Sequence, residues 1–255
     1  MAARQFPSLF ISHGSPMLAL DTSHPAHPFL RGLGQSLGKP QAILILSAHW
    51  ETPTPRVTGA PHPGTIHDFY GFPAPLYDLR YPAPGNHTLA QRVGGLLCPP
   101  AAVDLLRGLD HGAWVPLLLM YPQHDVPVLQ LSLQTSQGPA HHLKIGEALK
   151  PLREQGVLIV GSGGATHNLR EYFHPAGDNQ PYEDFAAWLQ TTLVSGDRAA
   201  LLDYRRRAPQ AARNHHTEEH FLPLFAALGA GGPKARRLHA SFDRTLAMDS
   251  YIFEE

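Results

Sequence analysis

The chain has 255 residues, a net charge of −1, 43% hydrophobic residues and 16% charged residues, which suits one folded domain spanning 1–255 and argues against disorder. The near-zero net charge gives no electrostatic basis for binding nucleic acid or an anionic membrane surface. Because no apolar run reaches the roughly 18–20 residues that span a bilayer, and no signal-peptide pattern opens the chain, we expect a cytoplasmic protein.

The first half of the sequence predicts strands and helices in alternation. Ile43–Leu46 are apolar without alternation, which is typical of a strand covered on both faces. The stretch 51–84 is rich in proline and aromatic residues and is expected to form an ordered loop over a site. Pro116 is acceptable only in the first turn of its helix. The predicted elements are a strand at 6–13, a helix at 28–37, a strand at 42–47, the loop at 51–84, a helix within 89–100 and a buried helix at 114–120.

The second half continues this alternation. In chain order it gives a strand at 126–133, a helix at 140–154, a strand from residue 156, helices at 182–194, 199–204 and 217–228, and edge strands at 237–241 and 247–252. The helix at 217–228 is expected to kink at Pro223. Strands that alternate with helices indicate a single α/β domain, with a central, partly parallel mixed sheet flanked by helices.

Three apolar runs end in small residues and then present one histidine each, at His13, His49 and His167. In an open α/β sheet, ligands collect beyond the carboxyl ends of the strands. His13 in SHGSP and His49 in SAHWE have matching contexts, and imidazole is the side chain most often found on metals. We therefore predict a metal site that uses these two histidines and a third ligand from elsewhere in the chain.

His111 and His167 each lie in a glycine-flanked loop, in LDHGAW and GSGGATHNL. The glycines either form turns around packed histidines or belong to a site where the histidines act as acid-base or supporting groups, because imidazole both accepts and donates protons near pH 7. Serine hydrolysis is not indicated, since Ser162 lacks the G-x-S-x-G spacing.

The segment 214–221, NHHTEEHF, offers a competing metal site. On a helix, His216 and His220 would share one face, with Glu219 close enough to act as a base. The string HTEEH fits the H-x-x-E-H pattern of inverted zinc metallopeptidases. That pattern is short, however, and no later helix supplies the acidic ligand that these enzymes need.

Other histidines and the one cysteine are expected to carry no chemistry. Cys98 is interpreted as a small core hydrophobe, and a single cysteine excludes an intramolecular disulfide or a cysteine-rich zinc site. The histidines interpreted as residues of polar loops and helix surfaces are His24, His27, His62, His87, His124, His141, His142 and His239.

Eight sequence blocks, in order and spanning nearly the whole chain, resemble the class III extradiol ring-cleavage dioxygenases. This is the family of the protocatechuate 4,5-dioxygenase catalytic subunit, and the blocks look in particular like its DOPA 4,5-dioxygenase-like branch. Each block alone is modest, but together they are specific. The blocks are FISHGSPM, LILSAHWE, TIHDFYGFP, YDLRYPAPG, LDHGAWVPLLLMYP, VPVLQLSL, GSGGATHNL and TEEHFLPLFAALG.

The resemblance implies that His13, His49 and His220 bind the metal. His167 would be the acid-base residue beside the metal, or a fourth ligand when zinc is bound, and His111 would contact the substrate or dioxygen. Three neutral imidazoles leave the +2 charge of Fe(II) or Zn(II) uncancelled, which favours a catecholate anion and accepts either metal.

One departure from the family concerns the third ligand. Protocatechuate-type members complete their site with a glutamate, whereas the matching residue here is His220. Glu218 and Glu219 are close enough in sequence that either stays open as a contributor.

The implied activity is Fe(II)-dependent cleavage of a catechol ring by O2, in a monomer or small homo-oligomer, with Zn(II) able to occupy the same site. The loop Thr65–Phe72, with His67, Asp68 and Tyr70, would cover the substrate and exclude water. The glycine-rich stretch Gly161–Gly164 would leave room for an aromatic ring against the backbone. A Memo-like binding protein, a homologue of these dioxygenases without catalysis, is the non-enzyme alternative.

Overall fold

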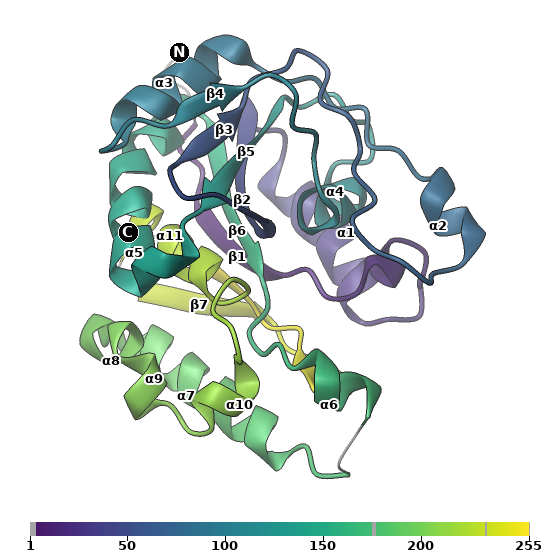
Figure 1. The fold of residues 1–255 in the computed structure, drawn as a ribbon, viewed down its shortest axis with the longest axis vertical. Coiled ribbons are helices and arrows are strands. Elements are labelled where there is room, and N and C mark those ends of the chain that lie inside the picture. The colour runs from purple at the N-terminus through teal and green to yellow at the C-terminus, as the bar shows by residue number, and fades with distance from the viewer. Residues whose placement is uncertain (1–3, 175–176, 233, 255) are drawn as a thin grey trace.

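A mixed β-sheet of eight strands organises the part of the chain that the computed structural model describes, residues 4–174, 177–232 and 234–254 (Figure 1). Its strand order is β4-β3-β5-β2-β6-β1-β10-β7. The four central strands are mutually parallel, and the predicted α/β fold with a partly parallel mixed sheet is confirmed. These strands are β1 (Ser8–Ser12), β2 (Ala42–Glu51), β5 (Val128–Leu133) and β6 (Val157–Gly163).

Antiparallel pairing closes both sides of the sheet. At one edge, β3 (Arg56–Thr58) runs antiparallel to β5 and pairs in parallel with β4 (Ala102–Asp104). On the other side, β10 (Ser250–Glu254) lies antiparallel between β1 and β7 (Lys234–His239). The prediction of two edge strands is therefore wrong for the second, because β10 is internal, with Tyr251 and Phe253 fully buried.

Each face of the sheet is covered by its own hydrophobic cluster. In β2, Leu44 and Leu46 belong to one cluster, whereas Ile43 and Ile45 belong to the other. Because successive strand residues point to opposite faces, this division confirms the prediction of a strand buried on both sides.

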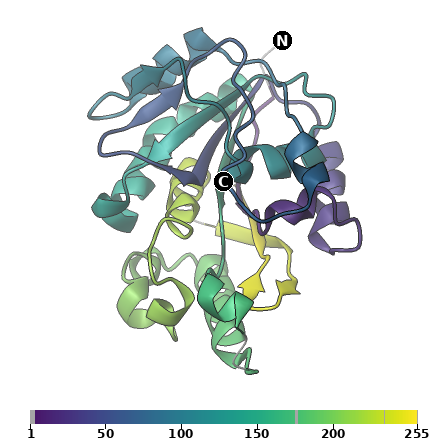
Figure 2. The same ribbon diagram turned by 45° about the vertical axis from the view of Figure 1, so that its right-hand side comes forward.

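The two faces carry different helices (Figures 1 and 2). The first cluster includes residues of α3 (His87–Leu96), α5 (Gly138–Leu149), α7 (Gln180–Ser195) and α11 (Leu222–Ala230). The second includes residues of α1 (Ala26–Leu37), α2 (Ala74–Asp78) and α4 (His111–Met120). The remaining elements are η1 (Pro16–Ala19), η2 (Thr135–Gln137), η3 (Lys150–Gln155), α6 (Leu169–Phe173), α8 (Arg198–Leu202), α9 (Tyr204–Arg207), α10 (Ala211–Asn214), β8 (Phe242–Asp243) and β9 (Leu246–Ala247).

Two helices begin elsewhere than the sequence pattern predicted. The buried helix α4 starts at His111, capped by the side chain of Asp110, so Pro116 lies inside it rather than in its first turn. Conversely, α11 starts only at Leu222, with Pro223 in its first turn, and 217–221 are not helical. A proline lacks the N–H that a helix interior uses, which favours starting α11 at Pro223 over the predicted kink.

The loop 51–84 is ordered, as predicted, and holds only the short elements β3 and α2. Two expectations about single residues are wrong. His27 and His142 are buried rather than on a surface; His142 donates from Nδ1–H to the Gly138 carbonyl and accepts from the Gln134 N–H. Cys98 is exposed rather than in the core. Among the described helices, none has the length and apolar character to cross a bilayer.

Candidate metal centre

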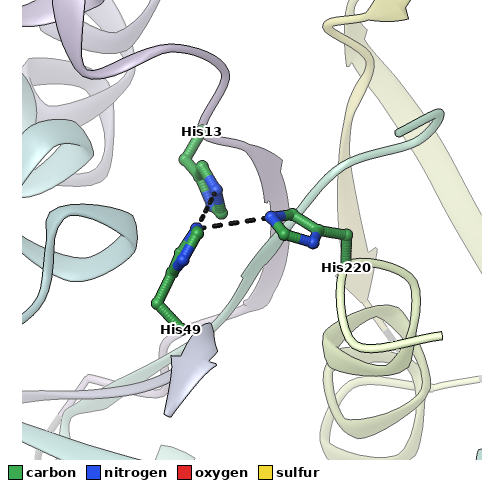
Figure 3. A group of neighbouring side chains, drawn as sticks. All are labelled: His13, His49 and His220. Carbon is green, nitrogen blue, oxygen red and sulfur yellow. Dashed lines mark hydrogen bonds between the residues drawn. The ribbon is translucent and has the colours of Figure 1, made fainter. Parts of the chain in front are cut away.

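Three histidines from distant parts of the sequence converge beside the carboxyl ends of the parallel strands (Figure 3). His13 directly follows β1, His49 lies near the end of β2, and His220 lies in the turn before α11. The Nε2 atom of His49 is 3.1 Å from His13 Nε2 and 3.3 Å from His220 Nε2. The structure thus brings together the three residues predicted as metal ligands.

The protonation of these rings fits a bound divalent metal. Ser162 Oγ donates its proton to the Gly112 carbonyl, so it accepts from His13 Nδ1–H at 2.9 Å. His220 Nδ1–H donates to Glu219 Oε1, also at 2.9 Å. Both Nε2 atoms are then unprotonated and face His49. Two nitrogens at about 2.0–2.1 Å from one tetrahedral zinc lie about 3.3–3.4 Å apart, close to the observed spacing.

Burial keeps the three imidazoles neutral, which is the form that binds metals. It lowers the pKa of His13 and His220 well below the ordinary value, with further lowering from neighbouring histidines. Burial and then the adjacent His111 lower the pKa of His49 to about 3. A cation at this point would therefore meet three neutral imidazoles near pH 7.

The hydrogen bond that orients His13 depends indirectly on a proline in the neighbouring helix α4. Pro116 has no N–H, so the carbonyl of Gly112, four residues earlier, has no helical donor. Ser162 in β6 supplies that donor and in turn accepts from His13. Gly112 must also lack a side chain, because a Cβ there would lie 3.2 Å from His13 Cε1 and 2.4 Å from Ser47 Oγ.

Asp68 connects the loop 51–84 to the other side of the site. Its Oδ1 accepts from both the backbone N–H and the Nδ1–H of His111, at 3.0 and 2.9 Å, and its Oδ2 lies 3.6 Å from His49 Nδ1. Burial opposes ionisation of Asp68, but its hydrogen bonds and attraction to His111 outweigh this and lower its pKa to about 2. Asp68 is therefore a carboxylate that orients the His111 ring and lies beside His49.

His167 lies flat against His220, with ring centroids 3.4 Å apart and the planes 7° from parallel. Its loop is fixed by the backbone, where His167 N–H donates to the Asn214 carbonyl at 2.9 Å. The buried His215 stabilises the same loop by donating from Nε2–H to the Ala165 carbonyl at 3.0 Å. Burial lowers the pKa of His167 to about 4, so its ring is neutral at pH 7 and can accept a proton.

The glycines of the stretch Gly161–Gly164 mainly allow close backbone packing, rather than leaving room for a substrate ring as expected. A Cβ at Gly161 would lie 2.1 Å from the Pro223 carbonyl oxygen, and one at Gly163 would lie 2.0 Å from that of His220. These glycines therefore let the chain around His220 approach β6. Gly163 and Gly164 also line the cavity beside the metal site, so only this end of the stretch borders space for a ring.

A cavity of about 240 Å³ opens from the five histidines His13, His49, His111, His167 and His220. Its remaining wall is mainly apolar and aromatic, including Phe69, Phe72, Leu169, Tyr172, Phe173 and Met248. Such a wall suits a planar ring placed against a metal.

Of the three residues predicted to contact substrate from the loop 65–72, only Asp68 lines this cavity. His67 instead donates from Nε2 to the Leu79 carbonyl at 3.1 Å. Tyr70 is 90% exposed. Phe69 and Phe72 reach the cavity in their place because they pack inward with the second hydrophobic cluster.

The metallopeptidase arrangement is not formed. His216 is exposed and belongs to none of the groups of potential ligands found among the described residues. Glu218 accepts from the Tyr204 hydroxyl at 2.7 Å and pairs with Arg205, while Glu219 holds His220 Nδ1. The two carboxylates thus support neighbouring side chains, and the third nitrogen at the centre is that of His220.

Sequence reasoning missed Ser162 and His215 as supports of the site. Ser162 was considered only as a nucleophile, and His215 was not distinguished from its neighbour His216. No local pattern marks either residue, because their partners, Gly112 and Ala165, are about 50 residues away in the chain.

The chain is similar to known proteins over nearly its whole length. Residues 7–253 match the family model described as the catalytic LigB subunit of aromatic ring-opening dioxygenase. A "4,5-DOPA dioxygenase extradiol" of Beta vulgaris is 45% identical, over 96% of each chain. The Escherichia coli K12 protein of the same name is 41% identical, over 90% of this chain and 87% of its own.

A solved structure shares the fold. The crystal structure of an uncharacterised Escherichia coli K12 protein superposes with a TM-score of 0.80 at 32% identity, and the match covers 98% of this chain and all of that one. The relatives from Beta vulgaris and Escherichia coli K12 that carry a functional name are both named as dioxygenases. This chain belongs to the family of catalytic subunits of aromatic ring-opening dioxygenases, and it is an extradiol ring-opening enzyme.

Proposed function

We propose that this protein is a non-haem Fe(II) dioxygenase that opens the ring of a substituted catechol such as L-DOPA, and that Zn(II) can occupy the same site. The observation that supports this most directly is the convergence of three Nε2 atoms next to a ring-sized cavity that also holds His111 and His167. The names of the relatives support the choice of an L-DOPA-like substrate.

His13, His49 and His220 would hold the metal. When bound, Fe(II) supplies the redox chemistry that couples a catechol to dioxygen, and three protein ligands leave positions open for both. The ligand set is neutral, so the site attracts the catechol as an anion.

The protein's own groups would handle the protons and exclude water. His167 accepts a proton from a catechol hydroxyl on its neutral ring and returns it as the ring opens. His111 lines the cavity, and its Nδ1–H is held by Asp68, so its ring is oriented for contact with the substrate. Phe69, Phe72 and Tyr172 pack around the substrate and keep bulk water away.

The decisive test is anaerobic reconstitution with Fe(II), followed by measurement of oxygen uptake and of the yellow muconic semialdehyde product from L-DOPA or caffeate. We expect turnover by the iron-loaded protein. An absence of turnover across a catechol panel, with iron shown to be bound, would rule the proposal out.

Two sets of variants separate metal binding from proton transfer. His13→Ala and His49→Ala should each lose the metal, whereas His167→Ala should keep it and lose activity by about 10²–10⁴-fold, the usual contribution of a general acid-base residue. Metal analysis of each purified variant checks the assignment. Full metal occupancy in His13→Ala would contradict the ligand set.

A further inference from the structure

The cavity beside the metal centre has no cation for a substrate carboxylate. No lysine or arginine is among the described residues that line it, and its one carboxylate, Asp68, is ionised. A carboxylate attached directly to the catechol ring would therefore lose water without gaining a charged partner other than the metal.

A second cavity, of about 270 Å³, lies next to the first. The two share part of their walls, formed by Ser15, Phe72, Tyr172, Phe173 and Met248. Unlike the first, the second cavity carries charged groups of both signs, namely Asp21, Asp243 and Arg244. A substrate whose ring lies at the metal could thus extend a polar side chain past the shared aromatic wall.

Tyr172 in this shared wall holds two of the charges in place. The Tyr172 hydroxyl donates to Asp243 Oδ2 at 3.0 Å. The guanidinium of Arg244 donates from Nη1 to the Tyr172 carbonyl at 3.1 Å and lies 5.1 Å from the centre of the Tyr172 ring. Arg244 also adopts a φ of 53°, a conformation uncommon for residues other than glycine. The contacts with Tyr172 place the guanidinium of this exposed residue at the cavity.

The third charge lies in the segment between η1 and α1. Asp21 Oδ1 accepts from the Ser23 N–H at 3.0 Å and from the Ser23 hydroxyl at 2.6 Å. Together the cavity presents two carboxylates and one guanidinium, which are complementary to a group that carries both an ammonium and a carboxylate.

We propose that this second cavity is a subsite for the α-amino-acid group of a catechol amino acid, with Arg244 pairing with its carboxylate and Asp21 and Asp243 with its ammonium. The inference rests on the proposed catechol dioxygenase function. In this arrangement, residues outside the metal centre select the side chain of the substrate. Catechols with a carboxylate directly on the ring should then be poor substrates.

The test compares catechols that differ in the charged groups of their side chains, using the iron-loaded full chain. L-DOPA carries both charges, dopamine only the ammonium, 3-(3,4-dihydroxyphenyl)propanoate only the carboxylate, and 4-methylcatechol neither. Arg244→Gln keeps a hydrogen-bond donor for the Tyr172 carbonyl but removes the charge. We expect it to raise KM roughly tenfold for L-DOPA and the propanoate, as loss of one charge-assisted hydrogen bond predicts, relative to its effect on dopamine and 4-methylcatechol.

Two further variants make the result specific. Asp21→Asn should raise KM for L-DOPA and dopamine but not for the propanoate, and Arg244→Lys should restore part of the discrimination that Arg244→Gln loses. Arg206→Gln is the matched control, because Arg206 is an exposed arginine in α9 that lines neither cavity. An equal change for all four substrates in Arg244→Gln would overturn the subsite.

Failure of the proposed function gives a different result. In that case, the wild-type protein would cleave none of the four compounds. Binding of the same compounds to the zinc-loaded protein, measured anaerobically by calorimetry, then still decides the subsite. Tighter binding of L-DOPA than of 4-methylcatechol that is lost in Arg244→Gln supports it, and equal binding of the two compounds refutes it.

Discussion

At the scale of single residues, Ser162 links a metal ligand to the helix behind it. It satisfies the Gly112 carbonyl that Pro116 leaves without a donor and fixes the tautomer of His13 through Nδ1. A hydrogen bond to the non-ligating nitrogen orients a histidine toward the metal and raises its basicity. Ser162 is thus a positioning residue for the centre rather than a nucleophile.

Ser162→Ala should weaken metal binding by about 10–100-fold, the usual effect of losing such a partner, because His13 Nδ1–H and the Gly112 carbonyl both lose their partner. A competitive titration of the apo protein with Zn(II) or Co(II) measures the change. Ser8→Ala is a matched control, since Ser8 is a fully buried serine in the adjacent β1 with no hydrogen-bond partner for Oγ. Equal affinities of Ser162→Ala and Ser8→Ala would show that the link is not used.

At the scale of elements, the position of the third ligand depends on how closely the chain before α11 approaches β6. Gly164 N–H donates to the His220 carbonyl at 2.8 Å, and Gly163 leaves no space for a side chain against that same carbonyl. The α5–α11 contact follows the same principle, because a Cβ at Gly146 would lie 2.1 Å from the Ala226 carbonyl oxygen. Glycines on β6 and α5 thus set the place of α11.

Gly163→Ala should therefore move His220 and reduce metal affinity at least tenfold, in addition to a cost of about 1–3 kcal/mol in folding free energy from overpacking. Gly32→Ala serves as the comparison, because nothing lies within 4 Å of a Cβ at this exposed position of α1. That change should stabilise the protein by about 1 kcal/mol through helix propensity. Urea unfolding with metal titration checks both, and normal metal affinity in Gly163→Ala would contradict the role given to β6.

At the scale of the whole molecule, the metal centre joins segments that are far apart in the chain. His13, His49 and His220 come from two parallel strands and a turn about 170 residues later. An ion bound by all three holds these segments together and binds the folded state only, so it should stabilise the whole domain.

Zinc at 100 times its Kd should add about 2.7 kcal/mol to the free energy of unfolding, which for a chain of this size raises Tm by about 5–10 °C. Differential scanning calorimetry of the apo and zinc-loaded protein measures the shift. His220→Ala should abolish it, whereas the exposed His216→Ala should retain it. Loss of the shift in His216→Ala as well as in His220→Ala would favour the metallopeptidase arrangement, which uses both histidines and which the structure does not form.

Much of this protein follows from the sequence alone. The α/β class and the doubly buried strand β2 follow from the order and continuity of the apolar runs, and His13 and His49 follow from their places at the ends of such runs. These features are local, because hydrophobic periodicity reports which face of an element is buried and where the element ends. The resemblance of ordered blocks supplied His220, which no local pattern distinguished from His216.

Only the tertiary structure decided which side chains support the centre. The sequence pattern over 217–228 predicted a helix, whereas the structure has a turn at His220. The internal position of β10 depends on pairing with β1, more than 200 residues away. The link from Gly112 through Ser162 to His13, and the charged cavity beyond Tyr172, likewise join residues that are far apart in the sequence. Hydrogen bonds and ion pairs act over a few ångströms in space. The order of residues in the chain does not give these distances, which depend on how the folded sheet brings the segments together.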